Sequence, residues 1–220
     1  MIEIMTPGMA HETAQGVVVY TTRPAVDNLS DSVQVIWQDI RGITAEQRRK
    51  AWALMTEIAA YQGQDKEDVY REQQTAFSIR NMEALQGRLF RLSSATVTEA
   101  RGFITLLIEI IIEYGIPTKE PLYGLCDDLQ RYMYACLIHK KCAVCGKKAE
   151  LHHYDRVGMG NSREKINHIG RRAMAVCREH HGLIDTIGQK AFDERYHLEP
   201  VAIDEAIAKK YGLKRKGDNE

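Results

Sequence analysis

Two short metal-binding motifs, separated by a polar segment that carries glycines, constrain this chain more than any other feature. The first motif is Cys142-x-x-Cys145 and the second is Cys177-x-x-His180. Two intervening residues let both side chains of a motif converge on one ion, and thiolates with an imidazole are common ligands of a tetrahedral structural zinc. The two motifs therefore predict one zinc site with these four ligands. The alternative is a pair of free thiols beside a surface histidine.

Three histidines next to these motifs remain without a role in the zinc site. Neighbouring residues of a strand point to opposite faces, so His152 and His153 cannot easily bind one ion as equal ligands. If a helix begins at Arg178, His181 and Asp185 share one of its faces and could bind a second metal with a residue from the preceding strand. We expect one histidine of the pair to bind that metal and the other to act as a general base. For His153 the alternative is a surface histidine with an incidental hydrogen bond.

The charge distribution indicates a polyanion as the binding partner. The formal net charge is zero, but the charges are unevenly spread along the chain. Residues 1–139 contain 13 Lys and Arg against 18 Asp and Glu, whereas residues 140–190 contain 11 against 5. The basic segment favours a surface that faces a polyanion, although an evenly solvated face would give a similar count.

Cysteine usage and the N-terminal residues indicate a cytoplasmic protein. The five cysteines are an odd number with three in metal-type spacing, which favours a reducing compartment over a disulfide framework. The first residues lack both the basic and the apolar region of a signal peptide. The most apolar run, residues 103–112, is too short to span a bilayer and contains Glu109, so we expect a buried helix and no membrane contact.

The segment before the cysteine motifs is typical of a mixed α/β domain. Thr44 with Gln47, and Thr96 with Glu99, form capping-box patterns that are each followed by apolar residues at helical spacing. Gly115 marks the end of the second of these helices. We expect helices from residue 44 onward, over 65–77, over 96–114 and roughly over 123–139, and strands over 16–20, 32–37 and 88–94.

The predicted fold class is therefore α+β, with a mixed α/β N-terminal domain followed by a small module stapled by zinc. No flexible Gly/Ser linker separates the two parts, so we expect them to pack closely. The chain divides into an N-terminal domain (1–120), a connecting helix (121–140), a metal-binding module (141–200) and a C-terminal helix with a basic tail (201–220).

The metal-binding module resembles the HNH endonucleases of the ββα-metal type, and in particular their zinc-containing, phage-encoded branch. The resemblance implies that His152 is the first ligand of a catalytic metal, His153 the general base that activates water, and His181 a further ligand of that metal. It also implies that His180 completes the structural zinc site. Asp185 stands where some members place another metal-binding histidine, and this carboxylate favours a hard ion such as Mg²⁺ or Mn²⁺.

The family also has a central asparagine a few residues before the second cysteine motif, and here the candidates are Asn161 and Asn167. We favour Asn167, because it lies nearer the second expected strand of the module. The resemblance implies hydrolysis of DNA with one divalent metal ion. Four arginines of the module are candidate phosphate contacts, with ordinary solvated charge as the alternative for each: Arg156, Arg163, Arg171 and Arg172.

Residues 32–116 resemble the phage Orf/NinB recombination proteins through the stretches QDIRGITAEQRRKAWALM and SSATVTEARGFITLLIE. That resemblance implies a homodimer that binds single-stranded DNA and works with a single-strand-binding protein and a recombinase. The candidate DNA contacts in this part include Arg49 and Lys50. We therefore expect a phage-encoded endonuclease in the cytoplasm of a bacterial host, acting on single-stranded or branched DNA in recombination. The alternative is a non-catalytic mediator that binds single-stranded DNA and carries only a structural zinc.

Overall fold

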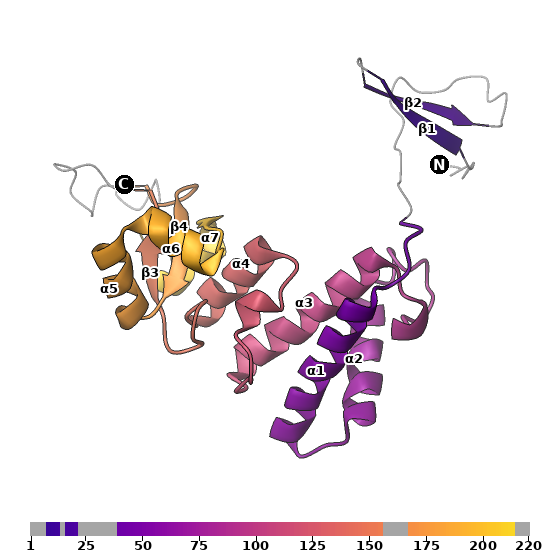
Figure 1. The fold of residues 1–220 in the computed structure, drawn as a ribbon, viewed down its shortest axis with the longest axis horizontal. Helices are drawn as coiled ribbons and strands as arrows, with labels where there is room; N and C mark the ends of the chain where they lie inside the picture. Colours follow the sequence, from indigo (N-terminus) through magenta and orange to yellow (C-terminus); the bar gives the residue numbers. More distant parts are fainter. Residues whose placement is uncertain (1–7, 14–15, 22–38, 156–166, 214–220) are drawn as a thin grey trace. The chain divides into compact units, whose positions relative to one another are not determined.

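The computed structural model describes four stretches of the chain, residues 8–13, 16–21, 39–155 and 167–213. Contacts divide the chain into two units, Met1–Gln38 and Asp39–Glu220. The second unit contains all of the expected zinc ligands, and Figure 1 shows its elements in order. Within the described residues no helix is long and apolar enough to cross a membrane.

The first unit contains an antiparallel hairpin of β1 (Gly8–Thr13) and β2 (Gly16–Thr21), in which Met9 lies opposite Tyr20. The strand expected over residues 16–20 is confirmed as β2, in keeping with the preference of β-branched valines for extended backbone. The strand expected over residues 32–37 lies outside the described residues.

Three helices begin the second unit: α1 (Ala45–Gln62), α2 (Lys66–Arg80) and α3 (Val97–Tyr114). Both predicted capping boxes are present, so that each N-cap threonine and the third helical residue satisfy one another's backbone N–H groups. α1 and α3 end at glycines in the left-handed conformation, Gly63 at φ 68° and Gly115 at φ 66°. The two predicted capping boxes and the predicted helix end at Gly115 are therefore confirmed.

The strand expected over residues 88–94 is wrong. The alternation that suggested it is real, because Phe90 and Leu92 are buried between exposed neighbours. The described residues offer this segment no partner strand. Instead, the N–H of Phe90 donates to the Ser78 hydroxyl at 2.9 Å, and the N–H of Leu92 donates to the Tyr70 hydroxyl at 3.1 Å. Hydroxyl groups of α2 thus accept hydrogen bonds from two backbone N–H groups that, in a sheet, would donate to a neighbouring strand.

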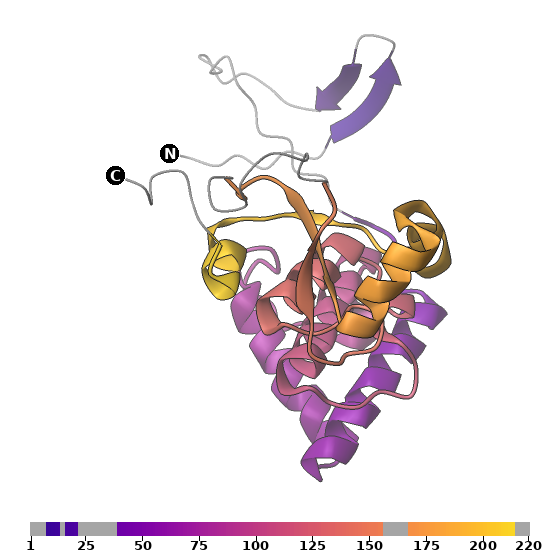
Figure 2. The ribbon, with the colours of Figure 1, turned by 90° about the vertical axis from the view of Figure 1, so that its left-hand side faces the viewer.

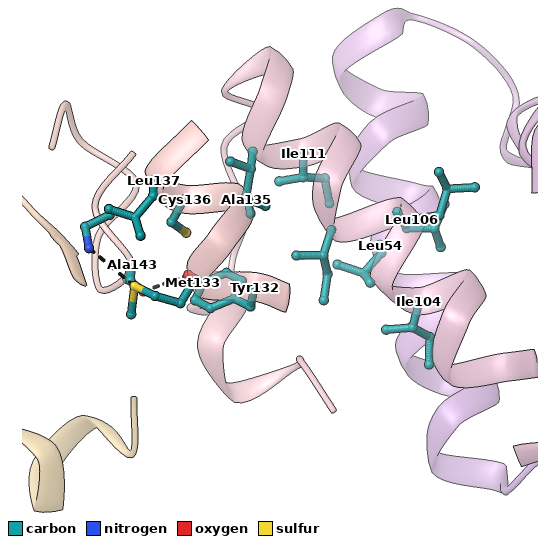
Figure 3. Close-up of a cluster of buried hydrophobic side chains, with 14 of the residues drawn as sticks. Leu54, Ile104, Leu106, Ile111, Tyr132, Met133, Ala135, Cys136, Leu137 and Ala143 are labelled. Atoms are coloured by element: carbon teal, nitrogen blue, oxygen red, sulfur yellow. Dashed lines mark hydrogen bonds between the residues drawn. The ribbon is translucent and has the colours of Figure 1, made fainter. Parts of the chain in front are cut away.

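α3 is the central helix of this unit and is buried along most of its length. Figure 3 shows Leu54 of α1 and Ile104 of α3 in the core that these helices form with α4. The ring of Phe103 lies 5.6 Å from that of Phe77 and 4.7 Å from that of Phe90, measured between centroids. The buried helix expected from the apolar run is therefore confirmed.

α4 (Leu129–His139) leads into the cysteine motifs. It begins six residues later than the expected Tyr123, because the Asp128 carboxylate accepts the N–H of Arg131 at 3.0 Å and caps the helix there. Two short 3-10 helices complete this part of the chain, η1 (Leu92–Ser94) and η2 (Leu122–Gly124).

A three-stranded antiparallel sheet follows, in the order β3 (Glu150–His153), β4 (Arg172–Val176) and β5 (Val201–Ala202). The central strand β4 is buried after its first residue and packs against α4, where the N–H of Ala175 lies 3.3 Å from the Met133 sulfur. The remaining helices, visible around the sheet in Figure 2, are α5 (Arg178–Ile187), α6 (Gln189–Tyr196) and α7 (Glu205–Tyr211).

The described residues are thus mostly helical, with one small sheet beside the cysteine motifs. Strand β3, strand β4 and helix α5 give the ββα order predicted for the zinc-stapled module. The description of the N-terminal part as mixed α/β fails between Asp39 and His139, where the chain contains helices and a single isolated bridge from Gly42 to Thr96. In this part of the chain the alternating apolar residues pack against helices, as Phe90 and Leu92 of the 88–94 segment do.

Candidate functional site

The four predicted zinc ligands come together in the fold. The ligand atoms of Cys142, Cys145, Cys177 and His180 all lie within 4.8 Å of one another. The Nδ1 atom of His180 lies 3.2 Å from the Cys177 sulfur and 3.6 Å from the Cys142 sulfur, and the sulfurs of Cys145 and Cys177 are 3.7 Å apart. Tetrahedral zinc with Zn–S bonds of about 2.3 Å requires sulfur separations of about 3.8 Å. The cluster therefore fits a structural zinc ion.

The backbone around the two motifs explains why these side chains converge. The first motif forms a tight turn in which the N–H of Gly146 donates to the Cys142 carbonyl at 2.8 Å. The N–H of Ala143 donates to the Ala175 carbonyl at 2.9 Å and ties this turn to β4. β4 ends at once in Cys177, the N-cap of α5, so that both motifs meet at the end of the central strand.

Two of the ligands are biased toward the protonation state that zinc requires. Burial alone would raise the pKa of the Cys177 thiol, but the backbone N–H groups of His180 and Glu179 at the start of α5 lower it overall. Burial also lowers the pKa of His180, which favours the neutral imidazole. In contrast, partial desolvation raises the pKa of Cys145 to about 12 although this residue is largely exposed, so its thiol depends on a bound cation for its deprotonation.

A second group of side chains lies between β3 and α5. The imidazole rings of His152 and His181 meet edge to face, with centroids 4.8 Å apart. The Nδ1 atom of His181 lies 3.7 Å from a carboxylate oxygen of Asp185, one turn further along α5. The fold thus brings together the three residues that the sequence assigned to a second metal. His152 lies beside His181, and His181 lies beside Asp185. Among the described residues, the Cys/His cluster is the group whose ligand atoms all lie within 4.8 Å of one another.

The ring of His152 is held by a chain of hydrogen bonds from α6. Its Nε2 atom lies 2.9 Å from the Gln189 side-chain oxygen, and the Gln189 amide donates to the Asp193 carboxylate at 2.8 Å. The Tyr154 hydroxyl donates to the other Asp193 oxygen at 2.9 Å. Burial lowers the pKa of His152, so its neutral, metal-binding form is favoured near neutral pH. Sequence reasoning missed Gln189, because no local pattern indicates that the start of α6 reaches β3.

His153 points to a different partner. Its Nε2 atom lies 2.9 Å from Nδ1 of His168, and the two ring centroids are 4.9 Å apart. His168 is 7% exposed, the one histidine in the buried polar set of the described residues. Sequence reasoning missed it, because the search in this segment was for an asparagine.

Asn167, the favoured central asparagine, lies at the surface and shapes the turn that carries His168. Its side-chain oxygen accepts a hydrogen bond from the N–H of Ile169 at 3.1 Å, and its backbone carbonyl accepts one from Nε–H of Arg171 at 3.2 Å. The other candidate, Asn161, lies outside the described residues. The side chain that reaches His153 from this turn is therefore that of His168.

The candidate DNA-contacting residues differ in whether their charges are already paired with carboxylates of the protein. Arg172 donates to Asp155 at 2.6 Å and lies over the Tyr154 ring, and this pairing lowers the pKa of Asp155. Lys50 is paired with Glu46 and Asp127. Arg49 is exposed on α1 and Arg171 is partly buried, whereas Arg156 and Arg163 lie outside the described residues.

Comparison with protein families gives a match that extends over most of the chain. Residues 20–214 match the profile of the family described as “Putative HNHc nuclease”. The matched range contains the helices α1 to α4 as well as the Cys/His cluster and the histidines around β3. Comparisons with curated proteins and with solved structures gave no match.

Proposed function

Since the chain belongs to the HNHc nuclease family, we propose that it is a DNA endonuclease that hydrolyses phosphodiester bonds with one divalent metal ion and a histidine base. The observation that carries the proposal is the contact between His152 of β3 and His181 of α5, one residue beyond the zinc-binding side chain of His180. A purely structural zinc lobe has no need for two further imidazoles with an adjacent carboxylate.

His152, His181 and Asp185 are the residues that would hold the catalytic metal. Two neutral imidazoles and a carboxylate are a suitable donor set for a divalent ion, and the carboxylate favours Mg²⁺ or Mn²⁺. When bound, such an ion supplies positive charge that stabilises the phosphorane-like transition state and the leaving 3′ oxygen. The hydrogen bond that the Gln189 side-chain oxygen accepts from Nε2 of His152 orients the His152 ring for this role.

His153 is the general base in this proposal. It follows the proposed metal ligand His152 on β3, and the resemblance to the HNH endonucleases assigns to this position the base that activates water. Asn167 contributes by closing the turn between residues 167 and 171, which carries the buried partner of His153.

The Cys142, Cys145, Cys177 and His180 cluster would hold zinc as a structural element. It joins the turn after α4 to the start of α5 and so fixes where α5 presents its next residue, His181. Adjacent histidines of α5 then have separate roles, one in the zinc site and one in the catalytic site.

Four arginines of the module, together with Arg49 and Lys50, are proposed phosphate contacts: Arg156, Arg163, Arg171 and Arg172. Single-stranded or branched DNA as the substrate, a homodimer, partnership with a single-strand-binding protein and a recombinase, and a phage origin rest on the Orf/NinB resemblance of residues 32–116. The proposed division at residue 120 follows the end of that resemblance, and the divisions at 140 and 200 follow the bounds of the HNH-like module. Location in the bacterial cytoplasm rests on that origin and on the reduced cysteines that zinc requires.

The test is cleavage of supercoiled plasmid and of branched DNA by the purified protein in Mg²⁺ or Mn²⁺. Wild-type protein should nick DNA, and His153→Ala should reduce the rate by at least about a hundredfold, because a positioned base contributes that much. Zinc content and circular dichroism should not change. His139→Ala, at the end of α4, is the matched control and should cleave like wild type. DNA binding by wild type without any cleavage would replace this proposal with the non-catalytic mediator.

A further inference from the structure

Asp193 lies on α6 next to the fully buried Phe192 and is itself partly buried. Its carboxylate accepts hydrogen bonds from two different parts of the module. One oxygen accepts from the Gln189 amide at 2.8 Å, and the other accepts from the Tyr154 hydroxyl at 2.9 Å. Asp193 therefore joins the start of α6 to the residue that directly follows β3.

The surroundings of the Gln189 amide determine which of its ends faces β3. Gln189 and Asp193 are four positions apart and so share one face of α6. A carboxylate can only accept hydrogen bonds, so the end of the amide that faces Asp193 is the NH₂ group. The same amide nitrogen lies 3.6 Å from the Met174 sulfur of β4, a weak acceptor. The amide oxygen is thereby directed at Nε2 of His152, 2.9 Å away.

The second partner of Asp193 is held by strand β4. The N–H of Tyr154 donates to the Arg172 carbonyl at 2.9 Å, and the Arg172 guanidinium lies 4.7 Å from the centre of the Tyr154 ring. Arg172 in turn donates to Asp155 at 2.6 Å. The Asp193 carboxylate is thus fixed from two sides, by its own helix and by a tyrosine that is attached to the sheet.

The orientation of the Gln189 amide matters because His152 is the residue of β3 whose ring meets His181 of α5. Metal-binding histidines are oriented by a hydrogen bond from the ring to a second side chain, which Gln189 supplies here. An amide can turn end for end, and with its NH₂ group toward the ring it would no longer accept that hydrogen bond. Asp193 opposes this turn, because the amide oxygen would then face a carboxylate.

We propose that Asp193 is a positioning residue of the nuclease site. It holds the Gln189 amide with the oxygen toward His152 and so keeps the His152 ring in place beside His181. The inference rests on the proposed nuclease function, in which these two histidines are ligands of the catalytic metal. Asp193 acts on the site through Gln189.

The experiment compares Asp193→Ala, which removes both acceptor oxygens, with Asp193→Asn, whose side-chain oxygen can still accept from the Gln189 amide. Asp193→Ala should weaken Mn²⁺ binding, measured by electron paramagnetic resonance, about tenfold to a hundredfold while the zinc content stays at one ion. Asp193→Asn should bind Mn²⁺ nearly as tightly as wild type. Since both variants remove the same charge, a difference between them reports the hydrogen bonds.

Glu194→Ala is the matched control, because it removes an exposed carboxylate from the next position of α6. This variant should bind Mn²⁺ like wild type. Equal weakening by Glu194→Ala and Asp193→Ala would mean that the charge of α6, and no specific contact of Asp193, supports the metal, and this result overturns the inference.

NMR of the His152 ring N–H, in zinc-loaded protein without Mn²⁺, provides a readout independent of metal binding and of cleavage. The hydrogen bond to Gln189 should slow exchange of this hydrogen with solvent in wild type and in Asp193→Asn, and exchange should be about tenfold faster in Asp193→Ala. Unchanged exchange or unchanged Mn²⁺ affinity in a folded Asp193→Ala protein overturns the inference. If that variant does not fold, loss of the slow exchange in Asp193→Asn does so.

Failure of the proposed function would be visible separately. If wild type neither binds Mn²⁺ nor cleaves DNA, the nuclease proposal is wrong, while the exchange rates still decide whether Asp193 holds the ring of His152.

Discussion

The imidazole of His152 packs edge to face against that of His181, with 4.8 Å between the ring centroids. One ring comes from β3, and the other directly follows His180, the histidine of the zinc cluster. The contact therefore links the Cys/His cluster to the proposed ligands of the catalytic metal through one peptide unit of α5. A change in the cluster should alter the positions of these proposed ligands, because the first turn of α5 carries residues of both groups.

Loss of one cysteine ligand should both remove the bound zinc and destabilise the module. Cys177→Ser should abolish bound zinc, measured by mass spectrometry of metals, because a hydroxyl is a poor replacement for a thiolate ligand. The melting temperature should fall by at least about 5 °C, since each kcal/mol corresponds to about 2–4 °C at this chain length. Cys126→Ser is the matched control, because Cys126 lies outside the cluster. Full zinc occupancy in Cys177→Ser would contradict the ligand assignment.

Binding of the proposed catalytic metal should depend on two residues of α5 that are not zinc ligands, His181 and Asp185. His181→Ala or Asp185→Asn should weaken Mn²⁺ binding by at least about tenfold, measured by electron paramagnetic resonance, while zinc content stays at one ion. Glu179→Gln serves as the control, because this exposed carboxylate is paired with Lys147. Equal weakening by the control would mean that general negative charge, and no specific site, attracts the ion.

The aromatic core of the helical part should account for much of its stability. Phe103 is fully buried and its ring lies against those of Phe77 and Phe90. Phe103→Ala should therefore reduce the free energy of unfolding by about 3–5 kcal/mol, as is usual for a buried aromatic ring. Denaturant titration measures the loss, with the exposed Tyr61→Ala as the control. A loss below that of the control would show that α3 is not packed as described.

The Cys126 thiol should react unusually slowly with alkylating agents. Burial raises its pKa to about 11, so at pH 8 the reactive thiolate is scarce. Relative to an ordinary thiol with a pKa near 8.5, the rate at pH 8 should be lower by on the order of a hundredfold and should rise with pH until about 11. Peptide mass spectrometry after iodoacetamide treatment gives the rate, and unfolding in urea should restore it. Equal rates in folded and unfolded protein would disprove the burial effect.

Sequence reasoning predicted the features that depend on short-range spacing. The capping boxes at Thr44 and Thr96 and the two cysteine motifs each involve residues at most three positions apart, and all four have the expected local structure. The meeting of His152 with His181 was implied by the resemblance to the HNH endonucleases, whereas spacing alone left open which histidine of the pair faces α5.

The features that sequence reasoning missed depend on contacts between distant segments. The 88–94 segment alternates like a strand, but whether it pairs is decided by hydroxyls of α2. Gln189 contacts His152 across 37 sequence positions, and His168 contacts His153 across 15. The spacing of residues in the sequence does not indicate either contact. The buried supporting side chains of a site are thus harder to predict than its ligands, whose chemistry restricts them to a few residue types.

The division of roles between adjacent histidines is the central claim, and anomalous diffraction from a crystal grown with zinc and Mn²⁺ tests it most directly. Data at the zinc and manganese edges locate each metal separately. We predict zinc on Cys142, Cys145, Cys177 and His180, and manganese beside His152, His181 and Asp185. Zinc bound by His181 in place of His180, or no manganese near His152, would contradict the account.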